Sequence, residues 1–183
     1  ENIYYEVLNE PHGISDFLWN NIQQSVVEVI RTVDTEHTII VGGAGWNSYN
    51  NLAAMPAYED DNLIYTFHFY DPFVFTHQGV TWTNPSMRSL QNIPFPYEEE
   101  QMPELPNDLL GTWVQFNHFA YPDQGNVDFV KELIDIAVQF REERGVPIYC
   151  GEFGVYQPNS QEPDRVFWYD AVRSYLEAQE IPW

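Results

Sequence analysis

Apolar runs of strand length alternate with helical periodicity along most of this chain. Residues 3–8 form an apolar run that ends at Asn9-Glu10-Pro11, and apolar positions then recur every three or four residues from Leu18 to Ile30. Ser15 or Asp16 can cap this predicted helix. The pattern predicts strands at residues 3–8, 38–41, 62–70 and 146–150, a fifth strand beginning at 181, and further helices at 127–144 and 163–176.

Residues 71 to about 124 interrupt this alternation. Prolines punctuate the segment, and residues 98–100 form an acidic patch. A loop of this length inside a compact domain is either functional or evidence against the assignment of elements, and we interpret it as functional. We therefore predict a single domain over residues 1–183 with a long loop insertion at about 71–125, which contains a short helix near 109–116.

The alternation of strands and helices indicates an α/β fold built from right-handed βαβ units. Polar residues that can take part in catalysis follow several different strands, which favours a (β/α)8 barrel over a doubly wound sheet. No glycine-rich phosphate loop follows the first predicted strand, so nucleotide binding is disfavoured.

The charge balance narrows the range of partners. The chain has 7 basic and 28 acidic residues, a net charge of −21. Such a surface repels phosphate backbones and anionic lipid, so we expect neither nucleic acid nor a membrane as partner. Aromatic residues make up 16% of the chain, and their flat rings can stack on sugars. A neutral polysaccharide fits this composition.

Nothing in the sequence indicates a metal or another cofactor. Cys150 is the only cysteine, which excludes an internal disulfide and a multi-cysteine zinc site, and its apolar run predicts a core position. The five histidines show no metal-binding spacing.

Two glutamates carry the main functional signal. Glu10 and Glu152 each lie where an apolar run gives way to turn residues. Two carboxylates that face each other across a cleft are what the hydrolysis of a glycosidic bond requires. The alternative for each is a solvated carboxylate at a strand end, which is common in so acidic a chain.

Several aromatic and histidine residues are candidates for substrate binding. His68 and Tyr70 are two apart in a predicted strand and so point the same way. Trp46 follows a glycine-rich stretch after the second strand, and His77 and Trp82 lie on the long loop. For these last three, sugar stacking and ordinary packing remain equally open.

Four motifs together resemble glycoside hydrolase family 5, and in particular its bacterial endo-β-1,4-glucanases. They are Asn9-Glu10-Pro11, His68-Phe69-Tyr70, Thr76-His77-Gln78-Gly79 and Gly151-Glu152-Phe153-Gly154. The resemblance implies that Glu10 is the general acid/base and Glu152 the nucleophile of a retaining mechanism. It also implies that Asn9 binds the sugar 2-hydroxyl, and that His68 and Tyr70 hold the hydrogen-bond network of the cleft.

The resemblance is limited to the C-terminal half of that family's barrel, roughly strands four to seven and the start of eight. It implies a secreted enzyme acting on cellulose or a related β-glucan; β-mannan, xyloglucan and mixed-linkage glucan are alternatives, as is an inactive carbohydrate-binding half-barrel. Four strands cannot close a barrel, and their open edges need cover. We expect a homodimer, with a second polypeptide or a longer chain that supplies the N-terminal half as the alternatives.

Overall fold

The computed structural model describes residues 3–183. The chain forms two compact units. The first comprises Glu1–Phe69, Leu133–Glu152 and Leu176–Trp183, and the second comprises Tyr70–Glu132 and Phe153–Tyr175. The prediction of a single domain remains a prediction.

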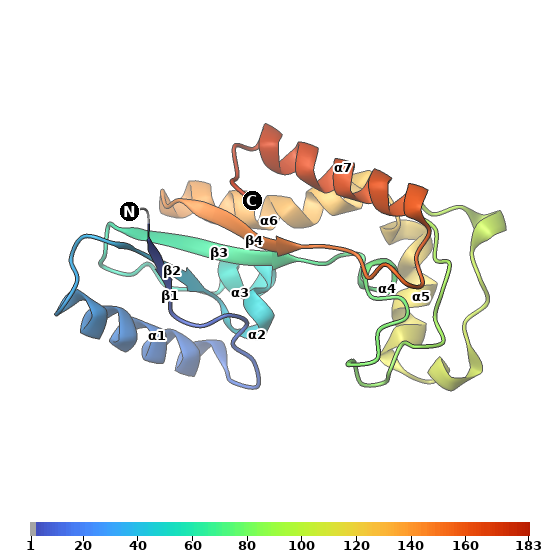
Figure 1. The fold of residues 1–183 in the computed structure, drawn as a ribbon, viewed down its shortest axis with the longest axis horizontal. Helices are drawn as coiled ribbons and strands as arrows, with labels where there is room; N and C mark the ends of the chain where they lie inside the picture. Colours follow the sequence, from blue (N-terminus) through green and yellow to red (C-terminus); the bar gives the residue numbers. More distant parts are fainter. Residues whose placement is uncertain (1–2) are drawn as a thin grey trace. The chain divides into compact units, whose positions relative to one another are not determined.

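A four-stranded parallel sheet organises the first unit. Its strands are β1 (Tyr4–Glu6), β2 (Thr38–Gly42), β3 (Leu63–Phe69) and β4 (Ile148–Phe153), and they lie side by side in chain order (Figure 1). Tyr5 pairs with Ile39, and Ile39 in turn pairs with Leu63. Parallel strands in chain order are those of a half-barrel, as predicted.

The strands differ in how far they are buried. In β3, Tyr65, Phe67 and Phe69 are buried, and so are Thr66 and His68, which alternate with them. Burial on both faces is typical of a central parallel strand. By contrast, all three residues of β1 are exposed. The sheet therefore ends in an uncovered strand.

Helix α1 (Asp16–Arg31) is attached to β2 by polar contacts. The Ser15 hydroxyl accepts a hydrogen bond from the Leu18 amide, which confirms the predicted cap. The buried Trp19 donates its indole N–H to the Gly42 carbonyl at 2.8 Å, and the Gln23 side-chain oxygen accepts from the Gly42 amide at 3.1 Å. These bonds fix the helix over the end of β2.

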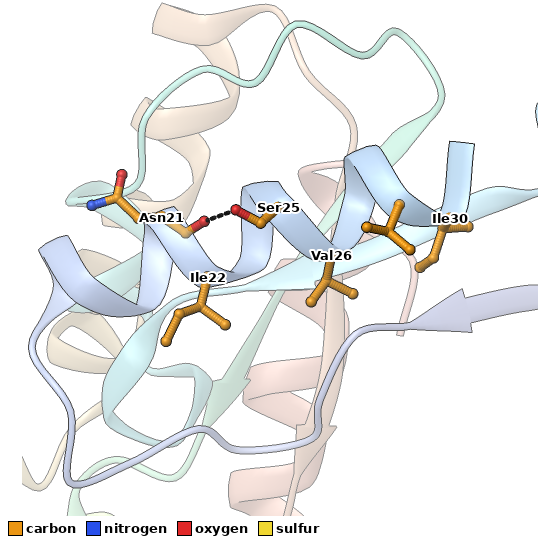
Figure 2. A pocket seen from close by; sticks show the side chains of 6 residues that line it. Asn21, Ile22, Ser25, Val26 and Ile30 are labelled. Carbon is orange, nitrogen blue, oxygen red and sulfur yellow. Dashed lines mark hydrogen bonds between the residues drawn. The ribbon is translucent and has the colours of Figure 1, made fainter. Parts of the chain in front are cut away.

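The periodic apolar residues of α1 are not the ones that it buries. Leu18, Ile22 and Val29 are 51%, 41% and 66% exposed. Figure 2 shows the groove that this side of the helix forms, and its lining residues are Asn21, Ile22, Ser25, Val26, Val29 and Ile30. Exposed apolar side chains therefore gather on this side of the helix.

Helices α2 (Ala44–Asn47) and α3 (Tyr49–Ala53) and most of α6 (Val127–Arg144) complete the first unit. α2 and α3 follow β2, and α6 precedes β4 as predicted. Residues 181–183 do not form the predicted fifth strand. The Ile181 amide bonds back to the Leu176 carbonyl in a helix-terminating turn. The Pro182 carbonyl accepts from Cys150, but proline has no N–H to extend a ladder.

The second unit contains the segment predicted to be irregular. It includes α4 (Phe73–Thr76), the 3-10 turns η1 (Glu99–Gln101) and η2 (Asn107–Leu109), α5 (Trp113–Gln124) and most of α7 (Glu162–Ala178). The helix predicted at 109–116 therefore begins and ends later.

Buried amide contacts replace regular pairing in this segment. The fully buried Gln78 donates to the carbonyls of Phe75 and Ile93 and accepts from the Ile93 amide. Such bonds satisfy backbone groups that a sheet would otherwise pair. Around them, Phe75 packs against Phe95 and Trp168.

Among the described residues, no helix is both long and apolar enough to cross a membrane.

Candidate active site

Three strands of the first unit bring the two predicted catalytic glutamates together. Glu10 follows β1, His68 is the penultimate residue of β3, and Glu152 is the penultimate residue of β4. Since parallel strands end at the same edge of a sheet, residues far apart in sequence meet there. This edge carries the candidate site.

His68 lies between the two carboxylates. Its Nδ1 is 2.9 Å from Glu10 Oε1 and 3.5 Å from Glu152 Oε2. The three ligating atoms lie within 4.8 Å of one another. The His68 side chain is 3% exposed, whereas those of Glu10 and Glu152 are 32% and 41% exposed. A buried imidazole thus holds two carboxylates that solvent or a substrate can reach.

A glycine lets β4 approach β3 at this point. A Cβ atom on Gly151 would lie 2.7 Å from Thr66 Oγ1 and 3.3 Å from His68 Nε2. Glycine therefore places the backbone beside Glu152 close to the imidazole.

A second network surrounds the backbone of Glu10. His12 Nδ1 is 2.9 Å from the Glu10 carbonyl oxygen, and the Trp46 amide donates to the Pro11 carbonyl at 3.0 Å. The rings of His12 and Trp46 are stacked, with centroids 5.1 Å apart and planes 4° apart. The predicted sugar platform Trp46 is therefore linked to the Glu10 loop, and its side chain stays 56% exposed. Asn9, which precedes Glu10, is also exposed.

The remaining predicted binding residues belong to the second unit. Tyr70 and His77 are in edge-on ring contact at 5.3 Å, and His77 also stacks on Phe73 at 3.8 Å. Trp82 is 67% exposed and contacts Tyr156 edge-on. Their roles in binding remain predictions.

The structure also reveals features that the sequence patterns did not. His12 was missed, although it follows Asn9-Glu10-Pro11 directly, because a lone histidine in a turn carries no spacing signal. Glu10, His68 and Glu152 lie close enough to hold a metal ion. Their wide separation in sequence hid this cluster from a search for metal-binding spacings.

His77 should make the stability of the protein depend on pH. Burial lowers the pKa of His77 to about 4 from the ordinary value of 6.5. As the pH falls below about 6.5, the unfolded chain binds a proton that the folded chain does not, so the free energy of unfolding falls until about pH 4. The full effect is at most about 3 kcal/mol. Urea unfolding at pH 7.5 and 4.5 should show that the free energy of unfolding falls less between these pH values in His77→Phe than in the wild type. An equal fall in both proteins would contradict this account.

Sequence comparison identifies the family. The chain matches Cellulase (glycosyl hydrolase family 5) over residues 1–183. It belongs to this family. The predicted resemblance is thereby confirmed.

Two curated relatives match over nearly the whole chain. Endoglucanase 3 of Fibrobacter succinogenes is 33% identical over 192 residues, which cover 100% of this chain and 29% of the relative. Endoglucanase C of Acetivibrio thermocellus is 31% identical, over 99% of this chain and 52% of the relative. The chain of this family 5 protein thus spans about half or less of the relatives that it matches.

Solved structures give the same picture. The endoglucanase Cel5A from Thermotoga maritima superposes with a TM-score of 0.78 at 27% identity, over 98% of this chain and 50% of that one. The partial-barrel prediction is confirmed, because the four parallel strands correspond to about half of that enzyme.

Proposed function

We propose that this family 5 chain carries the catalytic carboxylates of a retaining, endo-acting β-1,4-glucan hydrolase. The observation that supports this most directly is the separation of Glu10 and Glu152, which bring one side-chain oxygen each to within 4.8 Å of the other. Retaining glycosidases hold their carboxyl groups about 5–5.5 Å apart, and inverting ones need about 6.5–9.5 Å to admit a water. The observed spacing is on the retaining side.

The reaction then proceeds in two displacements. Glu152 attacks the anomeric carbon while protonated Glu10 gives its proton to the departing glycosidic oxygen, which leaves a glycosyl ester on Glu152. Glu10, now a carboxylate, takes a proton from water, and the resulting oxygen nucleophile displaces Glu152 from the sugar. His68 Nδ1 orients Glu10 through a hydrogen bond and also contacts Glu152 at 3.5 Å, and Asn9 and Trp46 bind sugar units beside Glu10. Tyr70, His77 and Trp82 are proposed to bind substrate as well.

The anomer that forms first tests this mechanism. Hydrolysis of cellotetraose by the wild-type chain should release the β-anomer, which then mutarotates, because two inversions restore the original configuration. Proton NMR of the anomeric signals during the first minutes distinguishes the two outcomes. An initial α-anomer would establish inversion, and the absence of any new reducing end would refute hydrolysis by this chain.

A second candidate substrate is β-mannan. A structure of Thermotoga maritima Cel5A, 28% identical to this chain, is described as a complex with a mannotriose substrate. The two glutamates act at the anomeric carbon and so serve either polymer. Parallel assays of carboxymethyl cellulose, barley glucan and mannan decide between them. Secretion remains a prediction.

We further propose that a second copy of the chain covers the exposed edge of the half-barrel. β1 is exposed throughout, and the groove on α1 is apolar. The chain corresponds to about half of its structural relatives, so two copies supply about as many strands as one closed barrel. A homodimer would bury both features.

Sedimentation velocity tests the homodimer. Wild type should sediment as a dimer, whereas Val29→Lys should be a monomer with unchanged circular dichroism, because the substitution puts a charge into the apolar interface. Gln24→Lys is the control, since Gln24 lies on the same helix, is exposed and bonds Glu28. A monomeric wild type would refute the homodimer.

A further inference from the structure

The loop that carries Glu10 is held in an unusual backbone conformation. Glu10 has φ 51° and Trp46 has φ 60°, both in the left-handed region that residues with a Cβ rarely adopt. Such residues persist only where their surroundings determine the conformation, and they cluster at functional sites. The contacts that hold these two residues are therefore part of the site.

His12 makes two of these contacts. The Glu10 carbonyl oxygen can only accept a hydrogen bond, so His12 Nδ1, 2.9 Å away, is the protonated nitrogen. The imidazole also lies parallel to the indole of Trp46. The Trp46 amide closes the loop by donating to Pro11. One side chain thus contacts both the backbone of the acid/base and the exposed ring next to it.

We propose that His12 is a positioning residue with two separable effects. Its Nδ1–H holds the Glu10 backbone so that the carboxyl group faces the glycosidic oxygen, and its ring supports Trp46 as a platform for the sugar on the leaving-group side. Glu10 protonates the leaving group, so a ring attached to its loop lies on that side of the scissile bond. This inference rests on the proposed hydrolase function.

Two substitutions separate the effects. His12→Asn keeps an N–H donor close to the position of Nδ1 but removes the ring, whereas His12→Phe keeps a ring to stack and removes the donor. In a Glu152→Gln background, which cannot hydrolyse the ligand, we expect His12→Asn to weaken cellotetraose binding about 3–10-fold in calorimetry, whereas in the active enzyme it should leave kcat near wild type. We expect His12→Phe to bind normally but to lower kcat on cellotetraose about tenfold.

An activated substrate isolates the proton transfer. 2,4-Dinitrophenyl β-cellobioside needs no acid to expel its phenolate, so His12→Phe should release dinitrophenol in its first turnover within about twofold of the wild-type rate. A merely structural role would slow both substrates equally in both variants. That result, or two variants indistinguishable from wild type, would overturn the proposal.

Ligand binding and the tautomer of His12 can both be measured without catalysis, so they test the role of His12 separately from the proposed hydrolase function. If the wild type leaves cellotetraose intact, hydrolysis fails and the binding measurement still applies. Nitrogen-15 NMR of neutral His12 should show a proton on Nδ1 and a free Nε2. The opposite tautomer would overturn the assigned hydrogen bond, whatever the activity.

Discussion

Replacing Glu152 by alanine should lower hydrolysis of carboxymethyl cellulose by about 10³-fold or more while the protein stays folded. Alanine cannot form the glycosyl ester, and no other described carboxylate shares the contact with His68 Nδ1 except Glu10. Loss of a group that acts only through the transition state lowers kcat and kcat/KM alike. Reducing-sugar release at saturating and limiting substrate measures both.

An external nucleophile should restore reaction of the Glu152→Ala variant, which tests the same prediction by a gain of activity. Azide can enter the space left by the Glu152 side chain and attack an activated β-cellobioside, which yields the α-cellobiosyl azide by a single inversion. Glu142→Ala is the control, because Glu142 is an exposed glutamate near the end of helix α6. Wild-type activity in Glu152→Ala would remove Glu152 as the nucleophile.

The strands and long helices could be predicted because their physical causes are local. The run that became β3 is buried on both faces and so is apolar and rich in β-formers throughout. Ser15 caps α1 as predicted because its hydroxyl has a nearby amide to accept from. The strand predicted to begin at residue 181 was wrong. An apolar residue before a proline resembles a strand start, whereas the backbone there closes the turn after α7.

Other features depend on contacts that no local pattern records. The apolar periodicity of α1 correctly predicted a helix, but its buried face is that of Trp19, Asn20, Gln23 and Val27. The buried Gln23 side chain is tolerated there because it bonds to both Gly42 and Tyr58. Residues 77–98 form no helix or strand, and side chains such as Gln78 bond to part of their backbone instead.

The candidate site was predictable only in part for the same reason. Glu10 and Glu152 were recognisable because each follows a strand-like run, and parallel strands bring such positions to one edge. The placement of His68 between them depends on the register of three strands. The stacking of His12 on Trp46 depends on left-handed backbone at residues with side chains, which composition does not indicate.

Replacing Glu10 by glutamine should lower kcat/KM for cellotetraose by about 10²–10⁴-fold, because the amide can neither protonate the leaving oxygen nor activate water. The substitution preserves the shape of the side chain. The two steps of the mechanism should separate with 2,4-dinitrophenyl β-cellobioside. Its leaving group needs no proton, so Glu152 can still form the glycosyl ester, but the ester then hydrolyses slowly without a base.

Stopped-flow absorbance should therefore record a burst of dinitrophenol close to the enzyme concentration, followed by slow turnover. Glu152→Gln is the matched control, because it removes the nucleophile by the same change from carboxylate to amide and should give no burst. If Glu10→Gln and Glu152→Gln gave bursts of equal size, Glu152 would not be the residue that forms the ester. If Glu10→Gln cleaved cellotetraose at the wild-type rate, Glu10 would not be the acid/base. The proposal that these two carboxylates act together on one glycosidic bond would then fail.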